Sequence, residues 1–431
     1  MKKNVHIISL GCVKNTVDSE IIAGGLESAG IELIDEAEDA DTIIINTCGF
    51  IGDAKQESVE VILEAAELKK KGKLEELLVA GCLSARYRDE LTKEMPEVDK
   101  FFVTEDFKRI FEHITTKPHL ADDPDHKRKL LTPRHYAYLK ISEGCDNVCS
   151  FCAIPLMRGK QRSRSLEDLV EEARSLVKRG VRELIVIAQD STTYGWDLRP
   201  KRYLHELLTE LDQVDGLDWI RLHYAHPSHF SRKLIPVFKN ARRIVPYLDI
   251  PVQHASTAML TAMKRGLDAD GLRRLLLNLR NEIPELKLRT SVIVGFPGET
   301  QDDFDTLLNF LEEIQFDRLG VFTYSEEEDT SGAELEDDVP PDVKVSRMDQ
   351  VMDLQHSISF NKNQELIGKE LDVIIDSTDP DVAGQMIGRS IWDAPEIDQV
   401  VYISGEIEQG AIIRAVVDDA GPYELYASPK N

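Results

Sequence analysis

The stretch Ser142-Glu143-Gly144-Cys145-Asp146-Asn147-Val148-Cys149-Ser150-Phe151-Cys152 places three thiols close together directly after an apolar run. We call Cys145, Cys149 and Cys152 the barrel thiols. A structural zinc site normally uses four protein ligands, and no fourth cysteine is nearby in the sequence. A cubic iron–sulfur cluster held by three cysteines instead leaves one iron open to a small-molecule ligand. The spacing therefore favours an iron–sulfur site over a zinc site.

The apolar run before this stretch is the first of six strand candidates in the middle of the chain. Helical patterns separate most of them, and one such helix has Ser165 as its N-cap and ends at Gly180. Six β/α units are too few for a complete eight-stranded barrel. We therefore expect a partial (β/α)6 TIM-like barrel over residues 131–362, with its active site at the carboxyl ends of the strands. The strand candidates are residues 137–142, 183–188, 220–225, 248–252, 288–295 and 319–324.

A second group of cysteines precedes the barrel. Apolar runs at residues 5–10, 42–46 and 77–80 alternate with helical patterns, which predicts an open parallel α/β sheet in a domain over residues 1–125. Cys12, Cys48 and Cys82 directly follow the three runs, and we call them the N-terminal thiols. Ligands bind outside the carboxyl ends of the strands in such a sheet, so we expect these thiols to meet. The alternative is that each is a buried core thiol, as free cysteines usually are.

The chain after the barrel combines an acidic loop, a helix and a third domain. Residues 326–339 hold eight acids and no base, which is typical of a solvated loop, and residues 343–366 can form one helix. Five short strand candidates then predict a small antiparallel β-barrel over residues 363–431. They are residues 371–375, 385–388, 400–404, 411–417 and 424–427. Residues 119–134, which contain several Asp and Pro, are expected to link the first two domains.

Composition and charge exclude several classes of protein. Six cysteines in 431 residues are too few for a scaffold held by disulfides. No window holds the roughly 18 uncharged apolar residues that a membrane-spanning helix needs, so we expect a cytoplasmic protein with no membrane partner. The 78 acids and 52 bases give a net charge of −26. This charge repels phosphate backbones and favours a basic partner, so nucleic acid is not the expected direct substrate.

The Cys-x-x-x-Cys-x-x-Cys run, on a strand-end loop that opens a six-unit barrel, resembles the radical S-adenosylmethionine (SAM) superfamily. Over essentially its full length the chain resembles one family within it, the methylthiotransferases, in which the small C-terminal barrel is a TRAM module. The resemblance implies SAM and two [4Fe–4S] clusters as cofactors. The barrel thiols would hold the cluster whose open iron SAM chelates, and the N-terminal thiols would hold a second cluster that takes part in sulfur insertion.

The resemblance also implies a reaction. An electron enters the first cluster, SAM is cleaved, and a 5′-deoxyadenosyl radical removes hydrogen from an unactivated carbon, which then receives a methylthio group. A second SAM supplies the methyl group. The implied partners are therefore a low-potential electron donor and a sulfur source, besides the substrate.

The family has two main branches, one modifying an aspartate of small-subunit ribosomal protein S-12 and the other an isopentenylated adenosine of tRNA. Lys14-Asn15 after the first cysteine resembles the first branch, although that branch more often has Pro where this chain has Val13. Three further matches lie at residues 154–164, 188–195 and 388–396.

The charge of the last domain favours the same branch. Residues 364–431 hold fourteen acids and four bases, whereas an RNA-binding face should be basic. An acidic module suits a basic ribosomal protein, free or within the small subunit, because complementary charge speeds their encounter.

Four residues are implied to contact SAM. Phe151 would pack on the adenine ring, and packing into the barrel rim is the alternative. Gln189 and Asp190 lie at the second strand end, where many members of the superfamily hold the SAM amino group. Glu299 closes a turn at residues 294–299 that resembles a common turn near SAM, although backbone needs alone also explain its glycines and proline.

Several histidines accompany these residues. His223, His226 and His229 repeat every three residues, which suggests a metal, but Pro227 interrupts them and we favour polar contacts or rim packing. Gln253-His254 follows the fourth strand candidate, where it either contacts substrate or SAM or forms a hydrogen-bonded pair.

Three functions remain in view. The first is an aspartate methylthiotransferase acting on ribosomal protein S-12. The second is a tRNA methylthiotransferase, which would need a basic surface that the total charge conceals. The third is a non-catalytic adaptor stabilised by zinc or inert clusters, against which the open-iron cysteine spacing argues.

Overall fold

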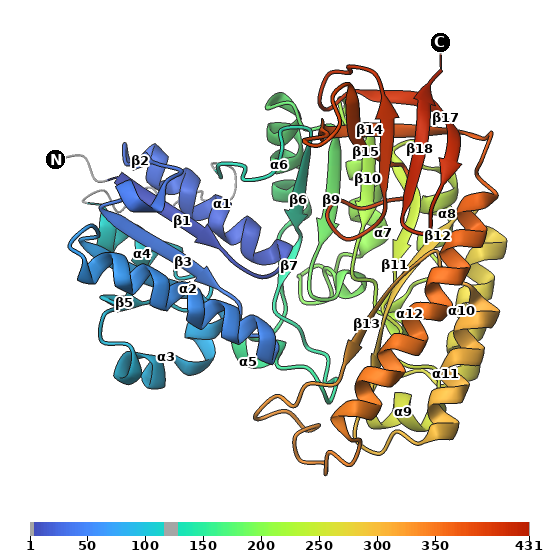
Figure 1. The fold of residues 1–431 in the computed structure, drawn as a ribbon, viewed down its shortest axis with the longest axis horizontal. Helices are drawn as coiled ribbons and strands as arrows, with labels where there is room; N and C mark the ends of the chain where they lie inside the picture. Colours follow the sequence, from blue (N-terminus) through green and yellow to red (C-terminus); the bar gives the residue numbers. More distant parts are fainter. Residues whose placement is uncertain (1–3, 116–127, 431) are drawn as a thin grey trace.

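The chain folds into three parts, which are seen side by side in Figure 1. The computed structural model describes residues 4–115 and 128–430. An α/β domain (blue) lies on the left of a large half-open barrel (green to orange), and a small β-barrel (red) covers one end of the large one. The expected linker at residues 119–134 and the expected boundary at residue 125 lie partly or wholly outside the described residues, so these boundaries stay predictions.

The first domain is an open, fully parallel sheet in the order β2-β1-β3-β4-β5. The three expected strands are β1 (Asn4–Ser9), β3 (Thr42–Thr47) and β4 (Glu76–Gly81), and they are neighbours in the sheet. Two edge strands of two residues each, β2 (Glu32–Leu33) and β5 (Lys100–Phe101), were not expected, since so short a run carries no periodicity. The helices are α1 (Val13–Ser28), α2 (Gly52–Lys70), α3 (Cys82–Glu94) and α4 (Phe107–Ile114).

The central part is the expected partial barrel. Its six strands lie in the order β13-β12-β11-β10-β9-β6, and every neighbouring pair is parallel. They are β6 (Tyr136–Lys140), β9 (Glu183–Ile187), β10 (Trp219–Leu222), β11 (Ile244–Asp249), β12 (Lys287–Val294) and β13 (Arg318–Thr323). Between β6 and β9, the short antiparallel pair β7 (Ser142–Glu143) and β8 (Arg162–Ser163) brackets the barrel thiols and α5 (Ile154–Arg158).

Helices cover the outer face of this barrel. They are α6 (Leu166–Lys178), α7 (Leu204–Leu211), α8 (Leu234–Asn240), α10 (Ala269–Glu282), α11 (Gln301–Ile314) and α12 (Pro341–Gln364). The short helix α9 (Thr257–Ala262) lies at the carboxyl end of the barrel, beside the loop of the barrel thiols (Figure 1). Ser165 is the N-cap of α6 as expected, and its hydroxyl accepts a hydrogen bond from Asp168 N at 3.2 Å. Leucine, valine and phenylalanine side chains of the helices and strands form the largest core of the molecule here.

Helix α1 of the first domain covers part of the inner face of the barrel. Val17 and Ile21 pack against Tyr138 of β6 and Ile187 of β9, on the face that the outer helices do not cover. In Figure 1, α1 accordingly lies between the first sheet and β6. The first domain therefore closes one side of the half-open barrel, and it carries the N-terminal thiols toward the barrel's carboxyl end.

The C-terminal domain is a closed five-stranded barrel in the ring order β14-β15-β16-β18-β17. Four of its five pairings are antiparallel as expected, but β16 and β18 run parallel. An odd number of strands cannot alternate direction all around a closed ring, so at least one pair must be parallel. The strands are β14 (Glu370–Thr378), β15 (Gln385–Ser390), β16 (Val400–Ser404), β17 (Ile412–Ala420) and β18 (Glu424–Pro429).

This small barrel plugs the amino end of the central barrel. Arg389 of β15 pairs with Glu183 at the start of β9 at 2.8 Å, and both side chains are buried. Arg318, at the start of β13, pairs with Asp393 at 2.6 Å. The motif residues at 388–396 therefore hold two domains together, and the carboxyl end of the central barrel is left for the site.

The acidic loop is not wholly solvated, so that interpretation was wrong at Glu327. This carboxylate is buried between Lys55 of α2 at 3.0 Å and Arg86 of α3 at 2.5 Å. Farther along the loop, Gly332 N donates to the carbonyl of Ser150 among the barrel thiols at 2.7 Å. The loop thus ties the first domain to the thiol-bearing loop of the barrel.

Candidate active site

The N-terminal thiols meet at the carboxyl ends of the three adjacent strands β1, β3 and β4, where the sequence placed them. Cys48 and Cys82 are buried and Cys12 is exposed, so Cys12 does not fit the alternative of a core thiol. The chain before Cys12 packs directly on the second thiol, because a Cβ atom on Gly11 would lie 2.9 Å from Cys48 Sγ. Gly11 also has a φ of +84°, which glycine adopts without strain.

Asn15 organises the backbone around these thiols. Its side-chain nitrogen donates to the carbonyls of Leu10 and Thr47, each at 2.9 Å, and so joins the ends of β1 and β3. Its side-chain oxygen lies 3.8 Å from Cys82 Sγ, at the end of β4. One amide therefore touches all three strand ends, which gives a structural reason for Asn15 in the Lys-Asn pair after the first cysteine.

The barrel thiols occupy the loop between β7 and α5. Cys145 N donates to Gly159 O at 3.0 Å, which closes the loop, and Ser150 Oγ donates to Ala262 O of α9 at 2.8 Å. Arg265 Nη1 donates to Cys149 Sγ at 3.2 Å. The loop is thus held from both sides with its thiols grouped.

The buried thiols of both groups are not free thiolates. Burial raises the pKa of Cys48, and it raises the pKa of Cys82 to about 12. In the barrel group, burial raises the pKa of Cys145 to about 11 and that of Cys152 to about 12. Such thiols stay protonated at neutral pH unless a bound cation replaces the proton. Three grouped sulfur donors per site, with no fourth, fit a cluster that keeps one iron open.

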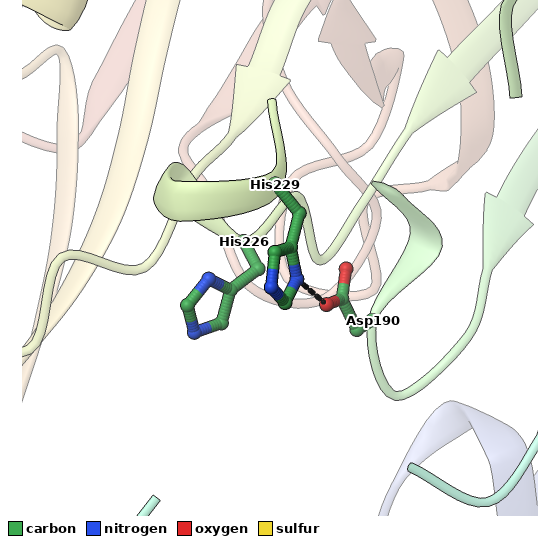
Figure 2. A group of neighbouring side chains, drawn as sticks. All are labelled: Asp190, His226 and His229. Carbon is green, nitrogen blue, oxygen red and sulfur yellow. Dashed lines mark hydrogen bonds and ion pairs between the residues drawn. The ribbon is translucent and has the colours of Figure 1, made fainter. Parts of the chain in front are cut away.

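Asp190, His226 and His229 form a polar group beside the barrel thiols, with their ligand-type atoms within 4.8 Å of one another. Figure 2 shows His229 turned toward the carboxylate, with His226 stacked beside it. His229 Nδ1 donates to Asp190 Oδ2 at 2.8 Å, and the same oxygen accepts from Asn147 of the thiol loop at 2.8 Å. The other carboxylate oxygen accepts from Thr192 N at 2.9 Å. These polar contacts account for the group without a metal.

The charges of this group follow from its burial. Burial opposes ionisation of Asp190, but the hydrogen bonds from His229, Thr192 and Asn147 outweigh it and hold the pKa of its carboxyl below the usual range. Burial, followed by the charge of Arg265, lowers the pKa of His226 to about 3, so that ring is neutral. The carboxylate of Asp190 is therefore ionised next to the barrel thiols. His223 lies apart, with its ring against Tyr247.

The other three residues implied to contact SAM take different positions. Phe151 packs against the cluster of Met259, Met263, Phe296 and Tyr324, as its rim-packing alternative expected. Gln189 donates to Glu143 Oε1 at 2.6 Å, while its own side-chain oxygen is buried with no hydrogen-bond partner in the described chain.

Glu299 has a fully buried side chain, and it closes its own turn by accepting a hydrogen bond from Gly295 N. Its carboxylate also contacts His254 Nε2 at 3.3 Å and Arg347 Nη1 at 3.2 Å. Gln253 has a φ of +71°, and its backbone pairs with β12. His254 therefore lies in a buried hydrogen-bonded pair with Glu299.

Sequence reasoning missed a buried group of charges between the two thiol groups. Lys140 of β6 pairs with Asp18 of α1 at 2.5 Å and with Glu143 at 2.7 Å. Arg158, the last residue of α5, pairs with Glu143 at 2.8 Å and with Asp18 at 3.1 Å. Burial would raise the pKa of Glu143, but Lys140 and Arg158 outweigh it and hold that pKa far below the usual range. Glu143 and Arg158 stand in stretches that the sequence singled out, but neither stretch indicated that they would pair with residues of another element.

Comparison with protein families divides the chain in the same way as the fold. Residues 4–103 match Uncharacterized protein family UPF0004, residues 139–311 match the Radical SAM superfamily, and residues 367–429 match the TRAM domain. The class of protein is therefore a radical SAM enzyme, for which an iron–sulfur cluster and SAM are the cofactors.

Two curated relatives are similar over nearly their whole length. The ribosomal protein uS12 methylthiotransferase RimO of Anaeromyxobacter sp. (strain K) is 47% identical, over 99% of this chain and 93% of the relative. The protein of the same name from Flavobacterium psychrophilum is 45% identical, over 100% of this chain and 99% of the relative. The chain belongs to the RimO family of methylthiotransferases, which confirms the expected resemblance and makes the protein a transferase.

Among solved structures, the radical SAM methyltransferase TsrM from Kitasatospora setae is similar with a TM-score of 0.55. The match covers 75% of each chain at 15% identity, so it supports the fold alone. In the part of the chain that the structure describes, no helix is both long and apolar enough to cross a membrane.

Proposed function

We propose that this protein replaces a β-carbon hydrogen of an aspartate in ribosomal protein S-12 with a methylthio group, using two [4Fe–4S] clusters and two SAM molecules. The observation that carries this proposal is the placement of two groups of three thiols on the two sides of α5. Ala153 and Met157, which follow the barrel thiols, pack directly against Cys82 of the other group. Two clusters held there would be close neighbours across one short helix.

The proposal assigns the barrel thiols to the cluster that binds SAM and the N-terminal thiols to the second cluster. When bound, these cofactors supply the radical that removes the hydrogen and the sulfur that replaces it. The loop of the barrel thiols carries the Asp190 group beside it. The ionised carboxylate of Asp190 suits the SAM amino group. The side-chain oxygen of Gln189 offers a hydrogen-bond acceptor that has no partner in the described chain.

Two parts of the fold help to exclude water from the inside of the barrel. Helix α1 covers part of the inner face of the barrel, and the C-terminal barrel plugs the amino end. A substrate side chain therefore has to enter at the carboxyl end, between the two thiol groups. Excluding water there keeps a reactive radical from side reactions.

The proposed partners follow from charge and chemistry. The net charge of −26 favours a basic ribosomal protein over tRNA. The reaction also needs a low-potential electron donor and a sulfur source. We place the reaction in the cytoplasm, where ribosomal proteins are found.

The experiment is one anaerobic reaction read by mass spectrometry. The full chain, reconstituted with iron and sulfide, is incubated with SAM, sulfide and reductant together with ribosomal protein S-12 and unmodified tRNA. We expect a methylthio increment on an aspartate of the protein and none on the tRNA. An increment on adenosine would overturn the substrate and keep the chemistry.

The Cys149→Ala variant is the matched control, because it removes one barrel thiol and should give neither modification nor cleavage of SAM. A colourless protein that binds only zinc after reconstitution would support the adaptor and overturn the enzyme.

A further inference from the structure

Arg158 lies between the two thiol groups. In the sequence it is near the barrel thiols, but in the structure it contacts the N-terminal group. It follows Cys152 on α5, yet its side chain turns toward the first domain, where Nη2 donates to Asn15 Oδ1 at 2.5 Å. That oxygen lies 3.8 Å from Cys82 Sγ. The neighbouring Met157 packs on the same cysteine. The guanidinium group is therefore next to the N-terminal thiols.

The charge of Arg158 lies at the ends of the strands that carry the N-terminal thiols. Its acceptor Asn15 donates to the carbonyls of Leu10 and Thr47, which precede Cys12 by two residues and Cys48 by one. Because Arg158 is only 5% exposed, water screens its charge little. A cation is thus built into the wall of the N-terminal site.

The charges around Arg158 add up to a neutral group, but Arg158 is the member that lies beside the N-terminal thiols. Asp18 and Glu143 are the acids of the group, and Lys140 and Arg158 are the bases, so the group as a whole is neutral. Arg158 is the member of the group that reaches Asn15. Removing its charge therefore leaves one uncompensated negative charge beside the N-terminal thiols.

The barrel thiols have a comparable neighbour. Arg265 is 6% exposed and donates through Nη1 to Cys149 Sγ at 3.2 Å, while its Nη2 donates to Pro251 O at 2.6 Å. Each thiol group thus has one buried arginine against it, and the two arginines come from different elements of the barrel.

We propose that Arg158 is a positioning residue that sets the reduction potential of the cluster held by Cys12, Cys48 and Cys82. The inference rests on the proposed function, since it requires that second cluster. Reduction adds one electron and no proton to a cluster, so a fixed cation and an N–H donor beside its sulfur ligands stabilise the reduced form. Arg158 therefore makes this cluster easier to reduce.

The test measures that potential in the full chain. The variant Cys145→Ala/Cys149→Ala/Cys152→Ala keeps only the N-terminal thiols, so a single cluster is titrated with a low-potential chemical reductant and followed by electron paramagnetic resonance. In this background we expect Arg158→Gln to lower the equilibrium constant for reduction at least tenfold, which corresponds to about 59 mV for one electron. Arg158→Lys, which keeps the charge, should recover most of the shift.

Arg128 provides the matched structural control. It is also buried at the interface between the first domain and the barrel, where it pairs with Glu20 of α1 at 3.0 Å and with Glu172 of α6 at 2.9 Å. Glu20 is about two turns along α1 from Cys12. Arg128→Gln also removes a buried arginine that pairs with two acids, and we expect it to leave the potential unchanged. Equal shifts in the two variants would overturn the inference.

A second background tests the specificity of the effect. The variant Cys12→Ala/Cys48→Ala/Cys82→Ala keeps only the barrel thiols, where Arg265→Gln should shift the potential and Arg158→Gln should not. If Arg158→Gln fails to load a cluster, Asp18→Asn/Arg158→Gln removes the charges as a pair and should still lower the potential.

The possible failures are distinguishable. An unchanged potential in both Arg158→Gln variants, with a normal cluster signal, overturns only the inference. No cluster signal in the first background, with Arg158 intact, overturns the proposed second cluster and the inference with it.

Discussion

Cys48 and Cys149 belong to different thiol groups, and their replacement by alanine should therefore have different effects. Cys48→Ala should remove about half of the bound iron, because a cluster held by three cysteines is expected to be lost when one of them is removed. It should leave SAM cleavage intact. Cys149→Ala should remove a similar share of iron and abolish cleavage. Iron content and 5′-deoxyadenosine measured on the same samples check both effects. SAM cleavage by Cys149→Ala at the wild-type rate would contradict the assignment.

Gly11 permits the close approach of Cys12 and Cys48, so its replacement should damage the N-terminal site. A Cβ atom there would lie 2.6 Å from Cys48 Cβ, and the φ of +84° strains any other residue. We expect Gly11→Ala to lose about half of the iron, as a variant lacking one ligand does, while SAM cleavage persists.

Gly30→Ala is the control for this prediction. Gly30 has a similar φ of +85°, but nothing lies within 4 Å of its added Cβ. It carries the backbone strain without the clash. Iron loss of equal size in both glycine variants would show that strain, and not contact with Cys48, is responsible.

At the scale of residues, close spacing grouped the barrel thiols, and the position directly after three apolar runs grouped the N-terminal thiols. The structure places them in two groups of three at strand ends. The sequence could not reveal Arg158 as a neighbour of the N-terminal thiols. Asn15 and Arg158 are 143 positions apart, and their contact exists only once two domains have docked. A single sequence carries local periodicity, which says nothing about such a pair.

Helix α12 and strand β13 are joined by a buried carboxylate, Asp317, which lies among three cations. Lys362 of α12 is 2.8 Å away, Arg280 of α10 is 3.0 Å away and Lys287 of β12 is 3.5 Å away. Burial alone would raise its pKa, but these cations lower it to about 2. Asp317→Asn should therefore reduce the free energy of unfolding by about 2 kcal/mol at pH 7, at 1.36 kcal/mol per pKa unit.

The pH dependence of this effect has a definite sign. Because folding lowers the pKa of Asp317, its contribution is complete above its ordinary pKa and is lost as the pH falls toward about 2. The difference between wild type and Asp317→Asn, measured by urea unfolding, should be constant from pH 7 to 5 and shrink below pH 4. Asp270→Asn removes an exposed partner of Arg273 on α10 and should change stability little. A difference that grows on acidification would contradict the prediction.

At the scale of elements, long apolar runs were predictable and short edges were not. The run at residues 42–46 became β3, because a continuous β-branched segment has few alternatives to a buried strand. Strands β2 and β5 have two residues each and exist only because a neighbour offers hydrogen bonds. The burial of Glu327 could not be predicted for a similar reason. Its neighbours in the sequence are acidic, and its partners Arg86 and Lys55 lie in another domain.

At the scale of the whole molecule, the three parts are joined by buried charge as well as by apolar packing. Glu183 of the central barrel pairs with Arg389 of the small barrel at 2.8 Å and with Arg221 at 2.8 Å. The motif at residues 388–396, which the sequence associated with the family, thus has a structural role in docking. The domain types could be predicted from the sequence, but their docking could not, because it depends on pairs between distant segments.

The net negative charge of the molecule should control the rate at which the protein encounters its substrate. With a net charge of −26, encounter with a basic ribosomal protein is accelerated by long-range attraction, which salt screens over about 10 Å at 0.1 M. We expect kcat/KM for ribosomal protein S-12 to fall about tenfold or more as ionic strength rises from about 0.05 to 0.5 M. Cleavage of SAM without substrate is the internal control, because Asp190, the acid expected to contact SAM beside the barrel thiols, is buried and should respond little to salt. If kcat/KM and the control both stayed constant, the acidic surface would have no part in recognition. Contacts at the carboxyl end of the barrel alone would then select the substrate.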